Sequence, residues 1–310
     1  MLFCGMNRYF LGECHYKMKK ILLGQNHLHT LGGSETFIYT LARELVNLGH
    51  VVDIITLQEG IMSRLINQKL GCSINAISNS YDLALLNHTT IVNGVKTLFP
   101  GSNIIQTCHG IFPDLEQPVP GVRHVAISKE VQCHLASRGF DSILIHNGID
   151  CNLFCESESP SKYLKKVFSL SQSDHFNQLL LEIGGELGIT VEYNNKFTSP
   201  RVDIQNVIKT ADLVVSLGRG AYEGMASAKP VLIADQRPYQ PGFLDGMVTS
   251  QNIDGFLENN CSGRKTQKPV TKENLLSEIE KYDFTQGPRN REYILENLNI
   301  QKQVQEYLKL

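Results

Sequence analysis

The chain has 310 residues, of which 42% are hydrophobic and 19% are charged, and its formal net charge is −2. This composition is typical of a globular protein, and at about 100–200 residues per domain the length predicts two domains. The nearly balanced charge argues against a strongly basic nucleic-acid-binding surface, and no apolar run approaches the roughly 18 residues that span a bilayer.

Eight cysteines are scattered along the chain, and the close pair Cys151 and Cys155 has no second pair at zinc-like spacing. We therefore expect free thiols in a reducing compartment, and a cytoplasmic location with at most a peripheral membrane contact. Residues 1–17 mix charged and apolar side chains and make a poor signal peptide, so we expect a disordered extension there.

Apolar runs and helical patterns alternate from Lys19 onward. The segment 34–49 carries apolar residues at helical spacing, with Ser34 as the expected N-cap and Gly49 just past the C-terminal end. A second helix is expected over 129–139, capped by Ser128. Strands are predicted at 20–24, 51–56, 83–87, 103–108, 124–128 and 142–147.

Residues 147–163 are polar and turn-rich, which indicates a linker, and the alternation then restarts. Strands are predicted at 165–170, 190–195, 213–217 and 230–234. Helices are predicted at 174–188, 202–211, 220–228 and 271–283, with one amphipathic helix over 289–310. Strand–helix alternation of this kind predicts two doubly wound α/β domains with mostly parallel sheets.

The expected organisation is therefore an N-terminal Rossmann-like domain over 18–150 and a C-terminal one over 151–288. The last helix, 289–310, is expected to cross back onto the N-terminal domain. In open parallel sheets ligands bind outside the carboxyl ends of the strands. Two such sheets facing one another predict a cleft lined by the residues that follow the strands.

Four segments resemble, in the same order, retaining glycosyltransferases of family 4, which have the GT-B architecture of two facing Rossmann-like domains. They are "LHTLGGSETFIYTLARELVNLGHVVDIIT", "IIQTCHG", "HVAISKEVQCHLASRGF" with "ILIHNGID", and "ADLVVSLGRGAYEGMASAKPVLIAD". The resemblance spans residues 19 to about 235. It implies transfer of a sugar from a nucleoside diphosphate sugar to an acceptor, with retention of configuration. A UDP-sugar is the favoured donor, and a GDP-sugar is the alternative.

The turn at 217–223 has the chemistry to bind the donor diphosphate. A helix N-terminus offers unpaired N–H groups and partial positive charge, Gly218 and Gly220 permit close approach, and Arg219 pairs well with phosphate. The resemblance implies that Glu223 holds the ribose hydroxyls. The alternative is a local ion pair between Arg219 and Glu223, four residues apart on one helix.

On the other side of the cleft, the resemblance implies that His109, at the end of a strand, is the catalytic residue and hydrogen-bonds the transferred sugar. A structural loop histidine is the alternative. Gly33 is expected beside the donor, whereas Gly32, His29 and Asn147 are expected on the acceptor side or at the hinge. A tight strand-to-helix turn is the other explanation of the Gly32–Gly33 pair.

Two features of the family pattern are missing. Val215, inside a strand, stands where the family's first glutamate is expected, eight positions before Glu223. The arginine and lysine expected after the first strand of the second domain are replaced by Ser169, Ser171 and His175. Arg219 is the expected substitute for their charge. The segment 245–269 is expected to be a surface excursion, or alternatively a lid that carries Arg264 and Lys265.

We expect no metal ion, because no D-x-D pair of carboxylates stands in a suitable loop, and no cofactor beyond the donor substrate. The expected partners are the nucleotide-sugar donor and an acceptor that the sequence does not identify: a saccharide, lipid, protein, small molecule or modified nucleic-acid base. A nucleotide-sugar epimerase on the same fold and a non-catalytic nucleotide-sugar-binding protein are the rival interpretations.

Overall fold

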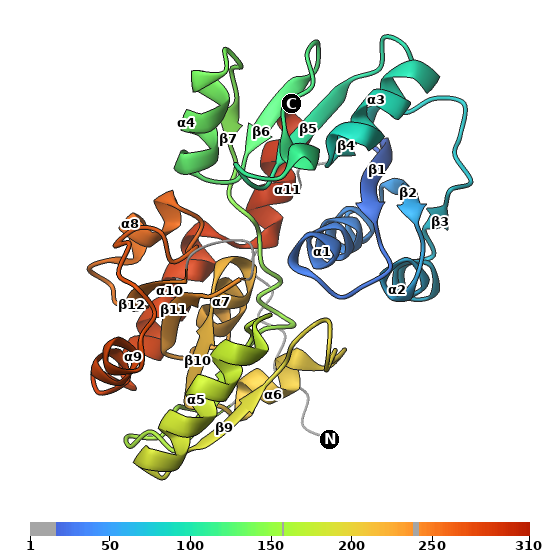
Figure 1. The fold of residues 1–310 in the computed structure, drawn as a ribbon. Helices are drawn as coiled ribbons and strands as arrows, with labels where there is room; N and C mark the ends of the chain where they lie inside the picture. Colours follow the sequence, from blue (N-terminus) through green and yellow to red (C-terminus); the bar gives the residue numbers. More distant parts are fainter. Residues whose placement is uncertain (1–16, 157, 238–241) are drawn as a thin grey trace.

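The computed structural model describes residues 17–156, 158–237 and 242–310. Its elements form two α/β halves, each built on one open sheet (Figure 1). The extension expected over 1–17 lies, except for Lys17, outside the described residues. All six cysteines within the described ranges are unpaired.

The first half contains a parallel seven-stranded sheet with strand order β3-β2-β1-β4-β5-β6-β7. The strands are β1 (Lys20–His27), β2 (Val51–Gln58), β3 (Ser73–Ile74), β4 (Leu83–Leu86), β5 (Ile104–Cys108), β6 (Arg123–Ala126) and β7 (Ile143–Leu144). The order reverses between β1 and β4, and a reversal of this kind opens a crevice at the carboxyl ends of the strands.

The helices of this half are α1 (Gly33–Asn47), α2 (Ile61–Leu70), α3 (Thr89–Leu98), the short 3₁₀ turn η1 (Asp114–Glu116) and α4 (Lys129–Ser137). The predicted cap of α4 is confirmed, because Ser128 Oγ accepts from the Val131 amide. The predicted cap of α1 is wrong: Gly32 is the N-cap, and Ser34 Oγ instead donates to the Glu35 carboxylate at 3.0 Å.

The second half contains a five-stranded sheet with strand order β12-β11-β10-β8-β9. Its strands are β8 (Lys166–Ser169), β9 (Thr190–Tyr193), β10 (Leu213–Ser216), β11 (Val231–Asp235) and the antiparallel β12 (Phe243–Met247). Its helices are α5 (Asp174–Leu187), α6 (Ile204–Thr210), α7 (Gly218–Ala226), α8 (Ile253–Glu258) and α9 (Lys272–Ile279). The expected alternation therefore holds up to β11, and β12 then pairs in the opposite direction.

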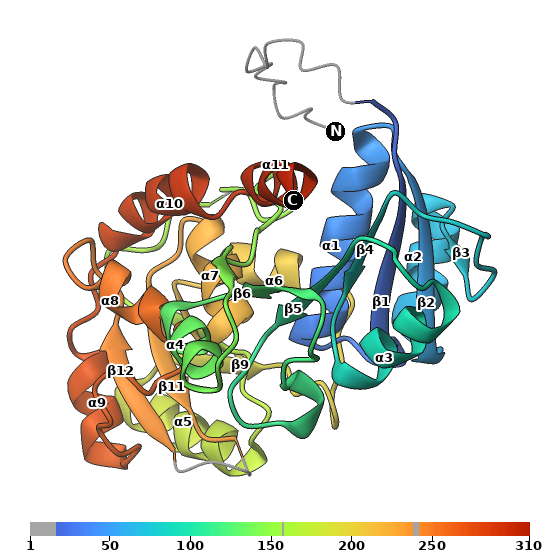
Figure 2. The same cartoon turned by 90° about the horizontal axis from the view of Figure 1, so that it is seen from above.

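The single helix predicted over 289–310 is wrong, because two helices, α10 (Gln286–Asn297) and α11 (Ile300–Lys309), occupy this segment. Asn299 has extended backbone between them, and its side chain accepts from the Gln301 amide and starts α11. α10 packs against α7, whereas α11 packs against α1 (Figure 2). Val304 and Tyr307 of α11 thereby join the core of the first half.

The two connections between the halves run side by side. The Ile149 amide donates to Leu298 O at 2.7 Å, and the Ile300 amide donates to Ile149 O at 3.0 Å. Gly148 permits this approach, because a methyl group there would lie 2.7 Å from the Cα of Ile300. The outgoing and returning segments are thus hydrogen-bonded to each other at one end of the space between the sheets.

Candidate active site

A cavity of about 350 Å³ lies between the carboxyl ends of the two sheets. The first half contributes the start of α1, the segment after β5 and the N-terminal turn of α4, and the second half contributes the segments after β8, β9 and β10. Most of the predicted site residues line this cavity: Gly32, Gly33, His109, Asn147, Gly218, Arg219, Gly220 and Glu223. The cleft inferred from strand ends is therefore present.

His29 is the predicted site residue that the structure does not bring to the cavity. Its side chain is exposed, and its backbone packs against the start of α2, where a methyl group at Gly60 would lie 2.5 Å from the His29 Cα. The segment after β1 turns toward α2 before it reaches Gly32, and His29 is therefore directed away from the cleft.

Arg219 is buried and its guanidinium bonds to three parts of the protein. Nε donates to Glu223 Oε1 at 2.9 Å, Nη1 to Gly148 O at 3.1 Å and Nη2 to Thr40 Oγ1 at 2.7 Å. The ion pair that the sequence offered as an alternative is thus present. Burial raises the pKa of Glu223, and the adjacent guanidinium opposes this rise. Contacts within the protein use three of the five N–H donors of Arg219.

The two glycines of the turn have structural roles of their own. Gly218 has φ +52°, a left-handed conformation that favours glycine, and its amide donates to Cys261 O at 2.9 Å. The Gly218 amide is therefore paired within the protein. A methyl group at Gly220 would lie 2.3 Å from Ser216 Oγ, so packing of α7 on β10 requires this glycine. The amides of Arg219 and Gly220 have no carbonyl acceptor one turn earlier in the helix, because they lie in its first turn.

The glycine pair before α1 faces this turn across the cavity. Neither Gly32 nor Gly33 has a positive φ, so a left-handed turn does not explain them. A methyl group at Gly32 would lie 2.4 Å from Glu35 Oε2, whereas one at Gly33 would meet only the Cβ of Arg219, at 4.0 Å. The absent side chain at Gly33 thus leaves open space between the N-termini of α1 and α7.

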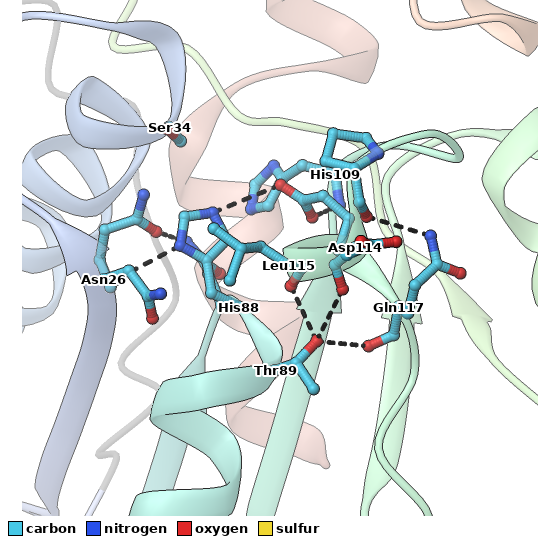
Figure 3. A network of polar contacts seen from close by, with 12 residues as sticks. Asn26, Ser34, His88, Thr89, His109, Asp114, Leu115 and Gln117 are labelled. Atoms are coloured by element: carbon cyan, nitrogen blue, oxygen red, sulfur yellow. Dashed lines mark hydrogen bonds and ion pairs between the residues drawn. The ribbon is translucent and has the colours of Figure 1, made fainter.

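His109 belongs to a polar network at the carboxyl ends of β4 and β5 (Figure 3). Its amide donates to Glu116 Oε2 at 2.8 Å, while Glu116 Oε1 lies 3.4 Å from His88 Nε2. Thr89 Oγ1 lies within hydrogen-bond distance of three carbonyls in and just after the η1 turn, and its hydroxyl thereby helps to fix the loop that carries Glu116. No sequence pattern marks Glu116, because it lies in a short 3₁₀ turn without periodicity.

The charge state of this network follows from its burial. Burial lowers the pKa of His109 to about 4, an effect that the carboxylate of Glu116 only partly offsets. Burial by itself would raise the pKa of Glu116, but its hydrogen bond with His88 and the nearby His109 bring it below the usual value. At neutral pH a neutral imidazole therefore stands beside a carboxylate. His109 Nε2 is buried and has no hydrogen-bond partner within the described ranges.

The segment 245–269 contributes to the cavity wall, so the expectation of a surface excursion is wrong. Arg264 lines the cavity and forms two bonds with Glu130 of α4, Nε to Oε1 at 3.0 Å and Nη2 to Oε2 at 2.5 Å. Its guanidinium also lies 5.4 Å from the ring of Phe112. Lys265 instead pairs with Glu258. This segment therefore ties the second half to α4.

The position after β8, where the sequence lacks the expected basic pair, holds a buried neutral network. Ser169 Oγ donates to Asn177 Oδ1 at 2.8 Å, and Asn177 Nδ2 donates to Ser171 O at 3.2 Å. Within the ranges that the structure describes, no group of three or more His, Cys, Asp or Glu side chains is arranged to hold a metal ion. In the same ranges no helix is both long and apolar enough to cross a membrane.

No protein-family model matches the chain, and no curated protein matches its sequence. Several solved structures share its fold. A glycosyltransferase from Rickettsia africae ESF-5 aligns with a TM-score of 0.64 at 15% identity, over 95% of this chain and 98% of that one. A Listeria monocytogenes protein assigned as a UDP-N-acetylglucosamine 2-epimerase aligns with a TM-score of 0.59 at 13% identity, over 94% and 95% of the two chains.

A third structure is an α-glucosyltransferase in complex with UDP and a 13-mer DNA that contains a HMU base. It aligns with a TM-score of 0.50 at 10% identity, over 95% of this chain and the whole of that one. Likeness at such low identity is a likeness of fold. The two α/β halves, one with a parallel sheet and one with a mostly parallel sheet, and these neighbours confirm the GT-B fold expected from the sequence.

Proposed function

We propose that this protein is a glycosyltransferase that moves a sugar from a nucleoside diphosphate sugar to an acceptor. The observation that carries the proposal is the placement of the α1 and α7 N-termini on opposite sides of one cavity, with His109 in its wall. Each helix N-terminus favours an anion, and the open space at Gly33 admits one between them.

In this proposal the second half binds the nucleotide. The amides of Arg219 and Gly220 face the diphosphate, and the remaining N–H donors of Arg219 add positive charge. Glu223 uses Oε1 for Arg219 and offers Oε2 to the ribose hydroxyls. Fixed donors of this kind stabilise the leaving diphosphate, so we propose catalysis without a metal ion or a further cofactor.

The first half would bind the acceptor and complete the catalytic geometry. His109 is neutral because its pKa is about 4, and a neutral ring does not add to the positive charge that develops on the transferred sugar. Its unpartnered Nε2 is the group that we propose to hydrogen-bond a sugar hydroxyl. Gly32 and Asn147 would lie on the acceptor side or at the hinge.

We further propose that the donor is a UDP-sugar, with a GDP-sugar as the alternative. We also propose that transfer retains the configuration of the sugar and that the protein is cytoplasmic. The neighbour that binds UDP supports the choice of nucleotide. Its DNA ligand keeps a modified nucleic-acid base among the acceptor classes, beside saccharides, lipids, proteins and small molecules.

A nucleotide-sugar epimerase is the second candidate, and the likeness to the Listeria monocytogenes structure favours it. The two candidates differ in their need for an acceptor. Incubation with UDP-N-acetylglucosamine alone would convert the sugar in an epimerase, whereas a transferase would leave it unchanged or hydrolyse it slowly.

The experiment that tests the proposal is a thermal-shift panel of UDP-, GDP- and dTDP-sugars, followed by acceptor screening with the donor that binds. A ligand at 100 times its Kd stabilises the folded state by about 2.7 kcal/mol, which gives a measurable shift. We expect one nucleotide series to raise the melting temperature and its sugar to be transferred. No shift with any series would contradict the proposal, and a shift without turnover on any acceptor would favour a non-catalytic binding protein.

A further inference from the structure

Among the residues that the structure describes, four cationic side chains line the cavity: Lys196, Arg219, Arg237 and Arg264. Arg219 bonds to Glu223, Gly148 and Thr40, Arg264 bonds to Glu130, and Arg237 also has a partner in the protein. Lys196 differs from these three arginines in its charge partners. Among residues 17–156, 158–237 and 242–310 no carboxylate forms an ion pair with it, and its Nζ lies 4.8 Å from the centroid of the Phe197 ring.

The ammonium of Lys196 stands at the N-terminus of α1, on the opposite half of the molecule. A methyl group built at the N-cap, Gly32, would lie only 3.0 Å from Lys196 Nζ. Both the helix N-terminus and the ammonium are positive, so an anion beside them is favourable. The Glu35 carboxylate lies near the same point, since its Oε2 would be 2.4 Å from that methyl group. The hydroxyls of Thr30 and Ser34 bond to this carboxylate at 2.7 and 3.0 Å, and within the described residues no ion pair joins it to Lys196.

The loop that carries Lys196 is firmly held. Asn195 is 2% exposed, and its side-chain amide donates to Gln172 O at 3.0 Å and to Asp174 Oδ1 at 2.8 Å. Its backbone amide donates to Ser199 Oγ at 3.1 Å. The loop is thus tied to the start of α5, and Lys196 is presented to the cavity from a fixed backbone.

Other atoms in the cavity wall also lack partners. Asn147 Oδ1 and Ser262 Oγ belong to side chains that are 6% and 4% exposed, and neither has a hydrogen-bond partner within the part of the chain that the structure describes. Buried polar atoms are nearly always hydrogen-bonded. These two therefore indicate that a polar ligand completes the cavity.

We infer that Lys196 is a diphosphate-binding residue, and that it binds a donor phosphate together with the N-terminus of α1. This inference rests on the proposed function. It places the diphosphate-binding cation on the segment after β9. The segment after β8 holds the neutral Ser169 and Asn177 pair, and Arg219 uses its guanidinium for bonds within the protein. An ammonium facing a phosphate forms a strong charge-assisted hydrogen bond.

The test is isothermal titration calorimetry on the full chain with UDP, UMP, inorganic pyrophosphate and, if UDP fails, GDP and dTDP. Lys196→Met removes the charge and keeps the apolar stem, and Lys196→Arg restores a cation. Lys162→Met is the matched control, because Lys162 is exposed outside the cavity and also lies over a ring, that of Tyr163 at 5.7 Å.

We expect Lys196→Met to weaken diphosphate binding by about tenfold or more, which is 1.4 kcal/mol, and to weaken UMP less. Lys196→Arg should recover most of the affinity, and Lys162→Met should match the wild type. The affinity of the wild type should also fall more steeply with added salt than that of Lys196→Met. Equal diphosphate affinity of Lys196→Met and wild type would overturn the inference.

Failure of the proposed function gives a different pattern. If no nucleoside diphosphate binds the wild type while pyrophosphate binds in a Lys196-dependent way, the proposed donor is wrong and the anion-binding role of Lys196 stands. If neither the nucleotides nor pyrophosphate bind the wild type, both proposals are overturned.

Discussion

Arg219 donates to Thr40 Oγ1 at 2.7 Å, which joins the first turn of α7 in one half to the middle of α1 in the other. Both side chains are buried. The two residues are 179 positions apart in the sequence. Arg219 therefore lines the cavity and also hydrogen-bonds the second half to the first.

Thr40→Val is expected to destabilise the protein by about 1–3 kcal/mol, because it leaves a buried guanidinium donor without its acceptor. Valine keeps the size and branching of threonine. Urea unfolding would measure the change. Thr97→Val is the control, since Thr97 is exposed and its hydroxyl bonds within its own helix, to Asn93 O. Equal losses for both variants would contradict the importance of this tie.

Gly33→Ala is expected to leave the fold intact and to impair donor binding. The methyl group would meet only Arg219 Cβ at 4.0 Å, so we expect stability unchanged or higher by up to about 1 kcal/mol. Overlap with a bound diphosphate would cost about tenfold or more in affinity, measured by calorimetry with UDP. Gly185→Ala, on the exposed side of α5 with no neighbour within 4 Å, controls for the substitution itself. Full affinity of Gly33→Ala would place the diphosphate elsewhere.

Glu223→Gln is expected to weaken binding of uridine, UMP and UDP by a similar factor, because the proposed partner is the ribose that all three share. Loss of one hydrogen bond to a charged group predicts about a tenfold effect or more. Titration calorimetry would measure the three affinities. Glu192→Gln removes a carboxylate from a surface ion pair with Lys166 and should change none of them. A loss confined to UDP would show that Glu223 acts on the phosphates through its ion pair with Arg219 and does not bind the ribose.

Stability is expected to fall as the pH drops from about 6.5 to about 4, partly because of His109. Its folded pKa of about 4 lies below the 6.5 of the free group, so the unfolded chain binds more protons in this range. The contribution is complete above pH 6.5 and its loss amounts to up to about 3 kcal/mol.

The measurement is urea unfolding of His109→Gln and wild type at several pH values between 4 and 7. The variant should show the shallower dependence, and the exposed His175→Gln should follow the wild type. Parallel curves for His109→Gln and wild type would show that His109 does not titrate below its usual range.

The sequence predicted the regular part of the fold well, because buried parallel strands and long amphipathic helices leave strong local patterns. It missed α2 and α3, which have short apolar faces of three or fewer buried apolar residues each. It also missed the break before α11, since Asn299 interrupts the helix to make contacts with Ile149, 150 residues away. Tertiary contacts decide such positions, and a local pattern does not contain them.

The residues of the candidate site also fall into a predictable and an unpredictable group. His109, Gly33 and the 218–223 turn follow strands, so the sheet topology alone predicts that they lie at the cleft. Glu116 and Lys196 lie in irregular loops, where no periodicity marks a side chain that faces a cavity. The sequence also could not predict the hydrogen bonds of Arg219 to Gly148 and Thr40, because these residues become its neighbours only when the two halves meet.

The position of α11 has a consequence for biosynthesis. Val304, Tyr307 and Leu308 pack with Ile21 and Leu23 of the first strand, yet the ribosome makes them only after the entire second half. Domains usually fold as they emerge, with the earlier one completing first. Here the half that emerges first must wait with part of its apolar interior uncovered until its last helix arrives, so during translation it is the part of the nascent chain that most needs chaperone protection.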